Sequence, residues 1–333
     1  MRARAAAAGG VEAVVAVDIG GTKTAAAVVD RAGGILSAVS APTRGAGGPD
    51  AIIATALDAA AQAVSGADAA ARADGPALLI RAAGIGTAGV VDVAAGAIVS
   101  STDTLSRWAG TPVRALFAAG LRERLRLDVP VHVQNDVDAH AVGELRFGAA
   151  RGARSALLVA VGTGIGASVI VDGHVLRGAH HVAGEIAHMP TPGAEHLRCP
   201  CGRMGHLEAI GSGVGMLRHH LSLGGDPAVA DGRALAALAA SGDAIAARAV
   251  RDCAQAIGRG IAGVMTVLDP ERVVITGSVA QAGPLWWEAL VTSLREQVID
   301  ALQETPVVHG ELGGDAPLRG AAASAWEQTE EKK

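Results

Sequence analysis

The sequence predicts an α/β protein built from two related halves. Its 333 residues are enough for two domains or one large one. An apolar run at 14–17 leads into a glycine-rich tip and a second apolar run, and the same pattern returns 144 residues later, from Val17 to Val161. Segments with helical alanine–leucine periodicity lie between and after these repeats. Strands that alternate with helices are typical of two-lobed α/β folds, whose ligands bind beyond the strand ends.

Each element is expected from its own local pattern. Two short apolar runs separated by glycines predict a hairpin over 14–29, which ends in a turn at 30–34. A strand is expected at 131–133, a second glycine-tipped hairpin at 157–171, and a last strand at 272–276. Alanine and leucine at helical spacing predict the helices, at 49–64, 112–125, 234–238 and 245–268.

Composition excludes several classes of protein. Hydrophobic residues make up 50% of the chain and aromatic residues only 2%, so the core must consist of aliphatic side chains. Charged residues are 18%, but the apolar positions are periodic, which argues against disorder. A net charge of −5 without any basic run is unsuited to neutralising nucleic-acid phosphates, so no nucleic-acid partner is expected.

Cysteine usage and the apolar stretches predict a soluble cytoplasmic protein. Cys199 and Cys201 are too close in sequence for a normal disulfide, which indicates a reducing compartment. The longest uncharged stretch, 155–171, has 17 residues and three glycines, short of the roughly 20 apolar residues of a membrane span. The alanine-rich start, 1–10, is interrupted by glycines before it reaches the length of a signal-peptide core.

The two glycine tips differ from the familiar nucleotide-binding motifs. In Gly20–Thr24 a threonine separates the glycines from the lysine, and the first glycine of a Walker A motif is missing. Gly162–Gly166 leads into a strand and not into the helix of a dinucleotide fingerprint. Each tip is either an ordinary hairpin turn or a backbone cradle for phosphate, with the hydroxyl of Thr22 or Thr163 beside it. The repetition favours the cradle.

Two further groups of residues carry chemistry. Asp136 follows the strand at 131–133, where a carboxylate can accept a proton from a hydroxyl nucleophile or simply cap the next helix. The soft ligands His188, Cys199, Cys201 and His206 suit tetrahedral Zn²⁺. The short Cys-x-Cys spacing also allows two buried thiols near scattered histidines.

Five motifs in order resemble the ROK family (repressors, open reading frames and kinases), over about Val14 to Ala325. They are Val17–Lys23, Gln134–Asp136, Gly162–Gly166, Gly184–His188 and Cys199–Glu208. The resemblance implies a two-lobed actin/hexokinase-like ATPase fold, of the ribonuclease H-like type, with a cleft between the lobes. It divides the chain into a smaller lobe, 12–134 plus 313–333, and a larger lobe, 135–312, that carries the zinc motif.

The resemblance also implies residue roles. ATP phosphates belong at the two tips, with Asp18 near Mg²⁺. The implied nucleotide contacts are Gly20, Gly21, Thr22, Lys23, Gly162, Thr163, Gly164, Gly277 and Ser278. Lys23 is either a phosphate ligand or a solvated lysine. Asp136 matches the catalytic base, and Asn135, Glu185, His188 and Glu208 match ligands of sugar hydroxyls. His188 would bind zinc through one ring nitrogen and sugar through the other.

The sequence departs from the family pattern at positions that matter for substrate and metal. His206 stands where a third zinc-binding cysteine is usual, and imidazole can replace it. Thr276–Ser278 replaces a glycine triplet, which weakens the assignment of the base pocket. Thr104 stands where an asparagine often contacts sugar, so the identity of the sugar is open. Trp108, in the same loop, is expected to pack inside the protein.

The expected function is an ATP-dependent hexokinase of the glucokinase type that makes a sugar 6-phosphate and forms a homodimer. N-acetylmannosamine or N-acetylglucosamine kinase and a non-catalytic sugar-binding regulator are the alternatives, and polyphosphate is a conceivable donor. A transcriptional repressor of the family needs a winged helix-turn-helix domain, and only 13 residues precede Val14.

Overall fold

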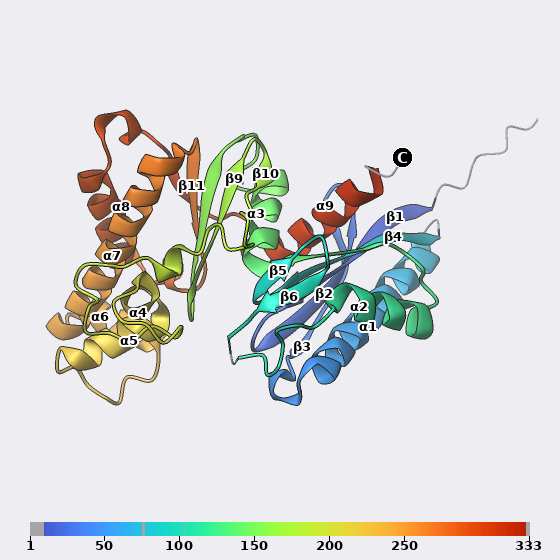
Figure 1. Ribbon diagram of the computed structural model, residues 1–333, viewed down its shortest axis with the longest axis horizontal. Coiled ribbons are helices and arrows are strands. Elements are labelled where there is room, and N and C mark those ends of the chain that lie inside the picture. The colour runs from blue at the N-terminus through green and yellow to red at the C-terminus, as the bar shows by residue number, and fades with distance from the viewer. Residues whose placement is uncertain (1–9, 75–76, 103, 331–333) are drawn as a thin grey trace, which may run out of the picture. The chain divides into compact units, whose positions relative to one another are not determined.

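The computed structural model describes residues 10–74, 77–102 and 104–330 (Figure 1). The expectation about the first residues falls mostly on 1–9, outside this part. Asp103 and the end of the expected smaller lobe, 331–333, also lie outside it. The chain forms two compact units, one reaching to Phe147 and resuming at Gly314, the other covering Gly148–Gly313.

The first unit is a five-stranded sheet between two helical layers. Its strands are β1 (Val11–Ile19), β2 (Lys23–Asp30), β3 (Ile35–Pro42), β4 (Leu78–Thr87) and β7 (Val131–Asn135), in the order β3-β2-β1-β4-β7. The β1–β2 and β2–β3 pairs are antiparallel, and the β1–β4 and β4–β7 pairs are parallel. A small hairpin of β5 (Val90–Asp92) and β6 (Ala97–Ser100) follows β4.

Alternate residues of β1 pack into the two helical layers. Val15 and Val17 belong to the core beneath α1 (Pro49–Asp74) and α2 (Val113–Gly120). Val14 and Ala16 belong to the core beneath α3 (Asp136–Phe147) and α9 (Ala316–Glu330). Because neighbouring side chains of a strand point to opposite faces, one apolar strand holds both layers. A π-helical turn at 121–125 continues α2 to the end of the expected helix.

Glycines let α3 and α9 approach unusually closely. A Cβ atom at Gly320 would lie 1.7 Å from Ala139 O, and one at Gly143 would lie 2.2 Å from Ala316 O. This packing places all of α3 in the first unit. The boundary therefore falls after Phe147, and not after residue 134 as expected from the sequence.

The second unit repeats the strand order of the first. Its sheet runs β10 (His174–Val175), β9 (Ile165–Val171), β8 (Ala156–Val161), β11 (Arg272–Thr276) and β12 (Val307–His309). The β8–β9 pair is antiparallel, and the β8–β11 and β11–β12 pairs are parallel. The two hairpins predicted from the repeat are thus confirmed as β1–β2 and β8–β9.

Helices bury the core of the second unit. They are α4 (Leu207–Gly211), α5 (Gly213–Ser222), α6 (Gly232–Ala240), α7 (Ala244–Leu268) and α8 (Pro284–Gln297). Leu157, Ile257 and Trp286, from the sheet, α7 and α8, are fully buried in one core. Single 3-10 turns lie at 45–47, 186–188, 279–281, 300–302 and 313–315.

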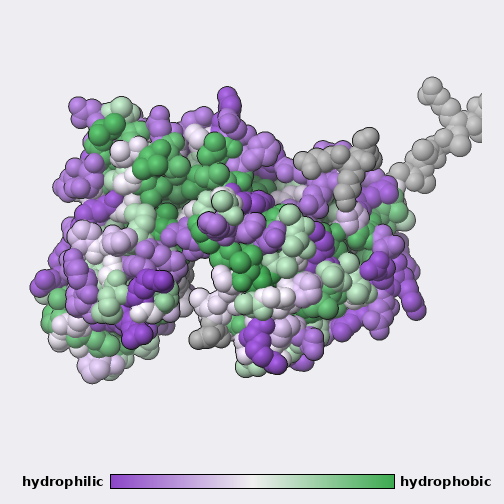
Figure 2. Space-filling model, viewed as in Figure 1, coloured by the Kyte–Doolittle hydropathy of each residue, from purple (hydrophilic) through white to green (hydrophobic). Residues whose placement is uncertain are grey.

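The surface mixes hydrophilic and hydrophobic residues. Figure 2 shows a hydrophobic area over α8 and β11 among hydrophilic residues of the second unit. In the part of the chain that the structure describes, no helix combines the length and apolar character that crossing a membrane requires.

Candidate active site and metal centre

Asn135 and Asp136 stand where β7 ends and α3 begins. Asn135 Oδ1 accepts hydrogen bonds from the amides of Val137, at 2.8 Å, and Asp138, at 3.1 Å, so this side chain caps the helix. Its Nδ2 donates to Gly89 O and to Asp136 Oδ1, both at 3.0 Å. These bonds use both donors and both lone pairs of the Asn135 amide, so in this structure it orients Asp136 rather than offering groups to a sugar.

Asp18 lies near Asp136, at the end of β1. Its Oδ1 atom is buried and has no hydrogen-bond partner among the described residues. Burial, and secondarily the charge of Asp136, raise the pKa of Asp18 to about 7, while Lys23 acts in the opposite direction. A buried carboxylate oxygen without a donor fits a cation ligand, because a hard cation such as Mg²⁺ prefers oxygen.

The first glycine tip is held by threonines. Gly20 N donates to Lys23 O at 3.0 Å and closes the turn, and Thr43 Oγ1 donates to Gly20 O at 2.8 Å. A Cβ atom at Gly21 would lie 2.3 Å from Thr104 Cγ2. The structure therefore places Thr104, the expected sugar contact, directly against the tip. The predicted packing role of Trp108 is confirmed, since it is fully buried and its Nε1 donates to Thr87 Oγ1 at 3.2 Å.

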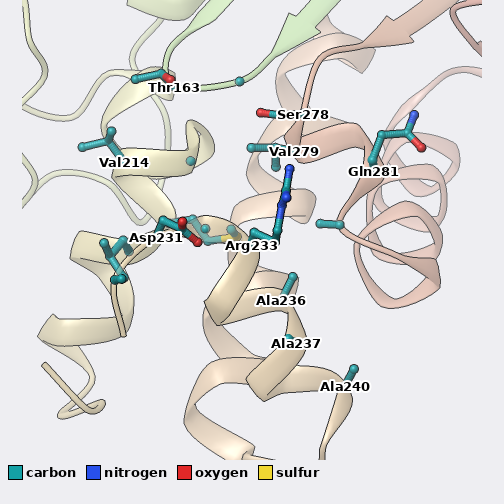
Figure 3. Close-up of a pocket in the computed structure, with 17 residues that line it drawn as sticks. Thr163, Val214, Asp231, Arg233, Ala236, Ala237, Ala240, Ser278, Val279 and Gln281 are labelled. Atoms are coloured by element: carbon teal, nitrogen blue, oxygen red, sulfur yellow. The ribbon is translucent and has the colours of Figure 1, made fainter. Parts of the chain in front are cut away.

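The second tip opens into a cavity of about 730 Å³. Three of the expected nucleotide contacts line it, namely Gly162, Thr163 and Ser278. Figure 3 shows Thr163 and Ser278 at one end and the alanines of α6 along the other, with Arg233 extending from α6 toward Ser278 and Val279. Cavities of this size accommodate cofactors.

Gly277 does not line this cavity, although its neighbour Ser278 does. Its φ of +96° suits glycine, and a Cβ atom there would lie 2.3 Å from Val161 O. Asp231, Arg233 and Gln281 also line the cavity, and the sequence reasoning missed them. The sequence offered a signal for Asp231 alone, because an aspartate just before an expected helix is a typical N-cap. In the structure Asp231 Oδ1 accepts from Ala234 N at 2.8 Å and caps α6.

The three expected sugar ligands of the second unit lie close together. Glu208 Oε2 accepts from Ile165 N at 2.9 Å, which ties the start of α4 to the second tip. Gly164 belongs to this contact and not to the cavity, since its Cβ would lie 2.8 Å from Glu208 Oε2. Burial raises the pKa of Glu185, and Glu208 adds to that rise while His188 opposes it. His188 Nε2 lies 3.8 Å from Glu185 Oε2.

The four soft ligands converge on one point. One donor atom from each of His188, Cys199, Cys201 and His206 lies within 4.8 Å of all the others. Nδ1 of His188 is 3.6 Å from Cys199 Sγ, and Nδ1 of His206 is 3.2 Å from Cys201 Sγ. Donor atoms around tetrahedral Zn²⁺ are about 3.3–3.8 Å apart. The two measured pairs are close to that spacing, and two thiols with two imidazoles are a ligand set that suits the ion.

Tight turns shape the loop over 199–206, which carries three of the four candidate metal ligands. Gly202, with φ +89°, donates its N–H to Cys199 O at 2.9 Å, and Cys199 N donates to Arg203 O at 2.8 Å. Gly205, with φ +78°, accepts from Thr191 N at 2.8 Å. The positive φ angles explain why glycines separate the ligands.

A family model described as the ROK family matches residues 14–328. The chain belongs to the ROK family. A glucokinase of Streptomyces coelicolor is 31% identical over 330 residues, which cover 94% of this chain and 97% of the relative. The family assignment agrees with the five ordered motifs in the sequence.

Solved ROK structures share the fold. The ROK hexokinase of Thermus thermophilus is 32% identical, with a TM-score of 0.80 over 96% of this chain and 99% of that one. A ROK glucokinase from Streptomyces griseus in complex with glucose and AMPPNP is 30% identical, with a TM-score of 0.75 over 95% and 99%. The expected two-lobed α/β fold of the actin/hexokinase-like ATPases is thus confirmed. In this ROK chain, Asp18, Thr104 and Asp136 belong to the first unit, and Glu185, His188 and Glu208 to the second.

Proposed function

We propose that this ATP-dependent sugar kinase phosphorylates glucose at the 6-hydroxyl, with Asp136 as general base. The observation that carries this proposal is the carboxylate of Asp136, which Asn135 Nδ2 and Val137 N orient at the end of β7, each at 3.0 Å. The similarity to glucokinases favours glucose. In the proposed step the sugar oxygen bonds to the γ-phosphorus, the bond to the β–γ bridging oxygen breaks, and Asp136 takes the hydroxyl proton.

The nucleotide would bind at the two tips and in the 730 Å³ cavity. The hydroxyls of Thr163 and Ser278 are available to phosphate oxygens, and the alanine face of α6 suits an apolar base. Asp18, whose buried Oδ1 has no described donor, would help hold Mg²⁺, which supplies charge neutralisation to the phosphates when bound.

The sugar ligands in this proposal are Glu185, His188 and Glu208. Carboxylates and an imidazole suit a polyol, because each hydroxyl can both donate and accept. Zn²⁺ held by the Cys199, Cys201 and His206 donors and by His188 Nδ1 would leave His188 Nε2 for the sugar.

An N-acetylhexosamine is the second candidate substrate, and the observation behind it is Thr104. By the family resemblance, this threonine stands where an asparagine often contacts sugar, and its methyl group packs against the position of Gly21. We also place the enzyme in the cytoplasm, where its three free cysteines stay reduced, and expect it to be a homodimer.

A coupled ADP-release screen tests the proposal. The panel is glucose, mannose, fructose, N-acetylglucosamine and N-acetylmannosamine, with the Asp136→Asn variant assayed in parallel. Polyphosphate, which releases no ADP, is tested as an alternative donor by measuring the sugar phosphate formed. The highest kcat/KM with glucose and ATP would support the proposal. A preference for N-acetylmannosamine would show that glucose is not the substrate. Turnover by Asp136→Asn at the wild-type rate would show that Asp136 is not the general base.

A further inference from the structure

A second cavity, of about 400 Å³, lies in the second unit and shares no lining residue with the first. Four polar residues of α7 contribute to it, namely Arg248, Asp252, Gln255 and Arg259. Their spacing of four, three and four residues puts them on one face of the helix. No role in phosphoryl transfer or in the zinc motif involves this polar face.

The charges in this cavity leave a positive excess. Asp252 Oδ2 accepts from His219 Nε2 at 2.8 Å and lies 3.5 Å from Arg248 Nε, so its single charge is already shared. Within the described part of the chain Arg259 forms no ion pair. Two guanidinium groups therefore face one carboxylate. The side chain of His219 is only 8% exposed, whereas those of Asp252 and Arg248 are 32% and 65% exposed, so the charged groups lie at the open side of the cavity.

The remaining wall combines imidazole, hydroxyl and apolar groups. His196 lies with its ring centroid 6.3 Å from that of His219, and Ser222 follows at the end of α5. Pro192, Ile210 and Leu223 supply apolar surface. The cavity thus offers cationic groups at one part of the wall and a mixed surface suited to carbon and hydroxyl groups elsewhere.

A Ser-His-Asp hydrolase is the competing interpretation of these residues, and the hydrogen bonds argue against it. Ser222 Oγ donates to His219 O at 2.7 Å and lies 3.4 Å from His219 Nδ1. The hydroxyl proton therefore points to a backbone carbonyl of the same helix and not to the imidazole that would have to remove it.

We propose that this cavity is a binding site for a small organic phosphate, whose phosphate group pairs with Arg259, while Arg248 stays with Asp252. Arginine is suited to phosphate because its planar guanidinium donates two parallel hydrogen bonds. A volume of about 400 Å³ falls within the range of small-molecule sites and has room for a phosphate together with a sugar-sized group. The site does not depend on which sugar the enzyme phosphorylates.

The ligand would also touch the zinc loop. Pro192 and His196 lie between the zinc ligands His188 and Cys199 in sequence, and Ile210 is two residues from Glu208. Occupation of the cavity is therefore positioned to act on the proposed sugar ligands through one loop and one short helix.

Calorimetric titration of the full-length enzyme tests the site, with glucose and AMPPNP present at saturation so that both proposed substrate sites are filled. The probes are glucose 6-phosphate, inorganic phosphate and additional glucose. We expect glucose 6-phosphate to bind more tightly than inorganic phosphate, with no response to additional glucose. In Arg259→Gln the affinity for glucose 6-phosphate should fall at least about 10-fold, the scale of one charge-assisted hydrogen bond.

Arg251→Gln is the matched control, because Arg251 is exposed on the same helix and does not line the cavity. It should leave the affinity unchanged, and Arg259→Gln should leave kcat unchanged without added phosphate. No binding to the wild type, equal binding by Arg259→Gln, or equal affinities for glucose 6-phosphate and inorganic phosphate would each overturn the proposal.

Discussion

At the scale of single residues, Asn135 caps α3, and Asp136 is left to act as the proposed base. Asn135 Oδ1 accepts from the first amides of α3, and Asn135 Nδ2 donates to Gly89 O and to Asp136 Oδ1. Asp136 is thereby oriented at the start of α3. A carboxylate in this position is suited to accept a proton from a positioned hydroxyl.

Replacing this carboxylate should affect chemistry and spare binding. We expect Asp136→Asn to lower kcat by at least about 100-fold, the usual scale for loss of a general base, while glucose affinity measured by calorimetry changes little. Asp138→Asn, two residues along α3, is the control and should retain activity. A fall in glucose affinity as large as the fall in kcat would contradict the role of Asp136 as base.

Asp18 should make folding stability depend on pH. Its pKa is raised from 3.8 to about 7 in the folded protein, so the folded state binds this proton more tightly than the unfolded state. Stability therefore falls as pH rises between about 4 and 7, by an amount on the order of a few kcal/mol, and the loss persists above pH 7.

Urea unfolding without divalent cations measures this effect. Asp18→Asn should be more stable than the wild type at pH 8, and the difference should vanish near pH 4. Added Mg²⁺ should stabilise the wild type at pH 8 and not the variant. Parallel pH profiles of the two proteins would show that Asp18 does not carry the raised pKa.

At the scale of elements, the loop between β10 and α4 carries both proposed zinc ligands and proposed sugar ligands. His188 ends a 3-10 turn, with Nδ1 toward Cys199 and Nε2 toward Glu185. His206 directly precedes α4, which carries Glu208. Any change in the donor cluster is therefore transmitted to two proposed sugar ligands over very few bonds.

Variants of His206 separate the metal from the rest of the site. His206→Cys should retain one zinc per chain and the wild-type glucose affinity, since thiolate is a good zinc ligand. His206→Ala should lose zinc and weaken glucose binding by about 10–100-fold, with the affinity for AMPPNP unchanged. Metal analysis and calorimetry provide the two readouts. Zinc-free wild-type protein with full glucose affinity would refute the coupling.

At the scale of the whole molecule, the C-terminal helix completes the first unit. The chain leaves this unit after Phe147, builds the second, and returns at Gly314 to add α9. The packing of α9 on α3 depends on Gly143 and Gly320. The position of Asp136, at the start of α3, therefore depends on residues nearly two hundred positions away.

Substitution at this crossing should destabilise the first unit. In Gly320→Ala the new methyl carbon would lie 1.7 Å from Ala139 O, so the helices must move apart, and we expect a loss of at least about 1–3 kcal/mol with reduced kcat. Gly314→Ala is the control, because nothing lies within 4 Å of its Cβ position. Chemical unfolding and steady-state assays provide the measurements. Equal stability of the two variants would contradict the close crossing.

The sequence alone determined the hairpins, the glycine tips, the two longest helices, α1 and α7, and the family, because these depend on local patterns. The helices α8 and α9 were not expected from it. The repeat at Val17 and Val161 predicted both strand pairs, and the spacing around Cys199 predicted the ligand cluster. The edge strands β3, β10 and β12 carry weaker signals, since their residues are half exposed or very few. They became evident only in the structure.

Only the tertiary structure decided how the site residues share their hydrogen bonds and where the units divide. No local pattern shows that the amide of Asn135 uses all its hydrogen-bonding groups inside the protein. Nor does one show that Gly164 lies against Glu208 rather than in the cavity, or that α3 packs on α9. The polar face of α7 is visible in the sequence, but the cavity beside it also needs α5 and the loop that holds Pro192 and His196. Contacts between segments far apart in the chain depend on packing, and packing is a property of the folded molecule.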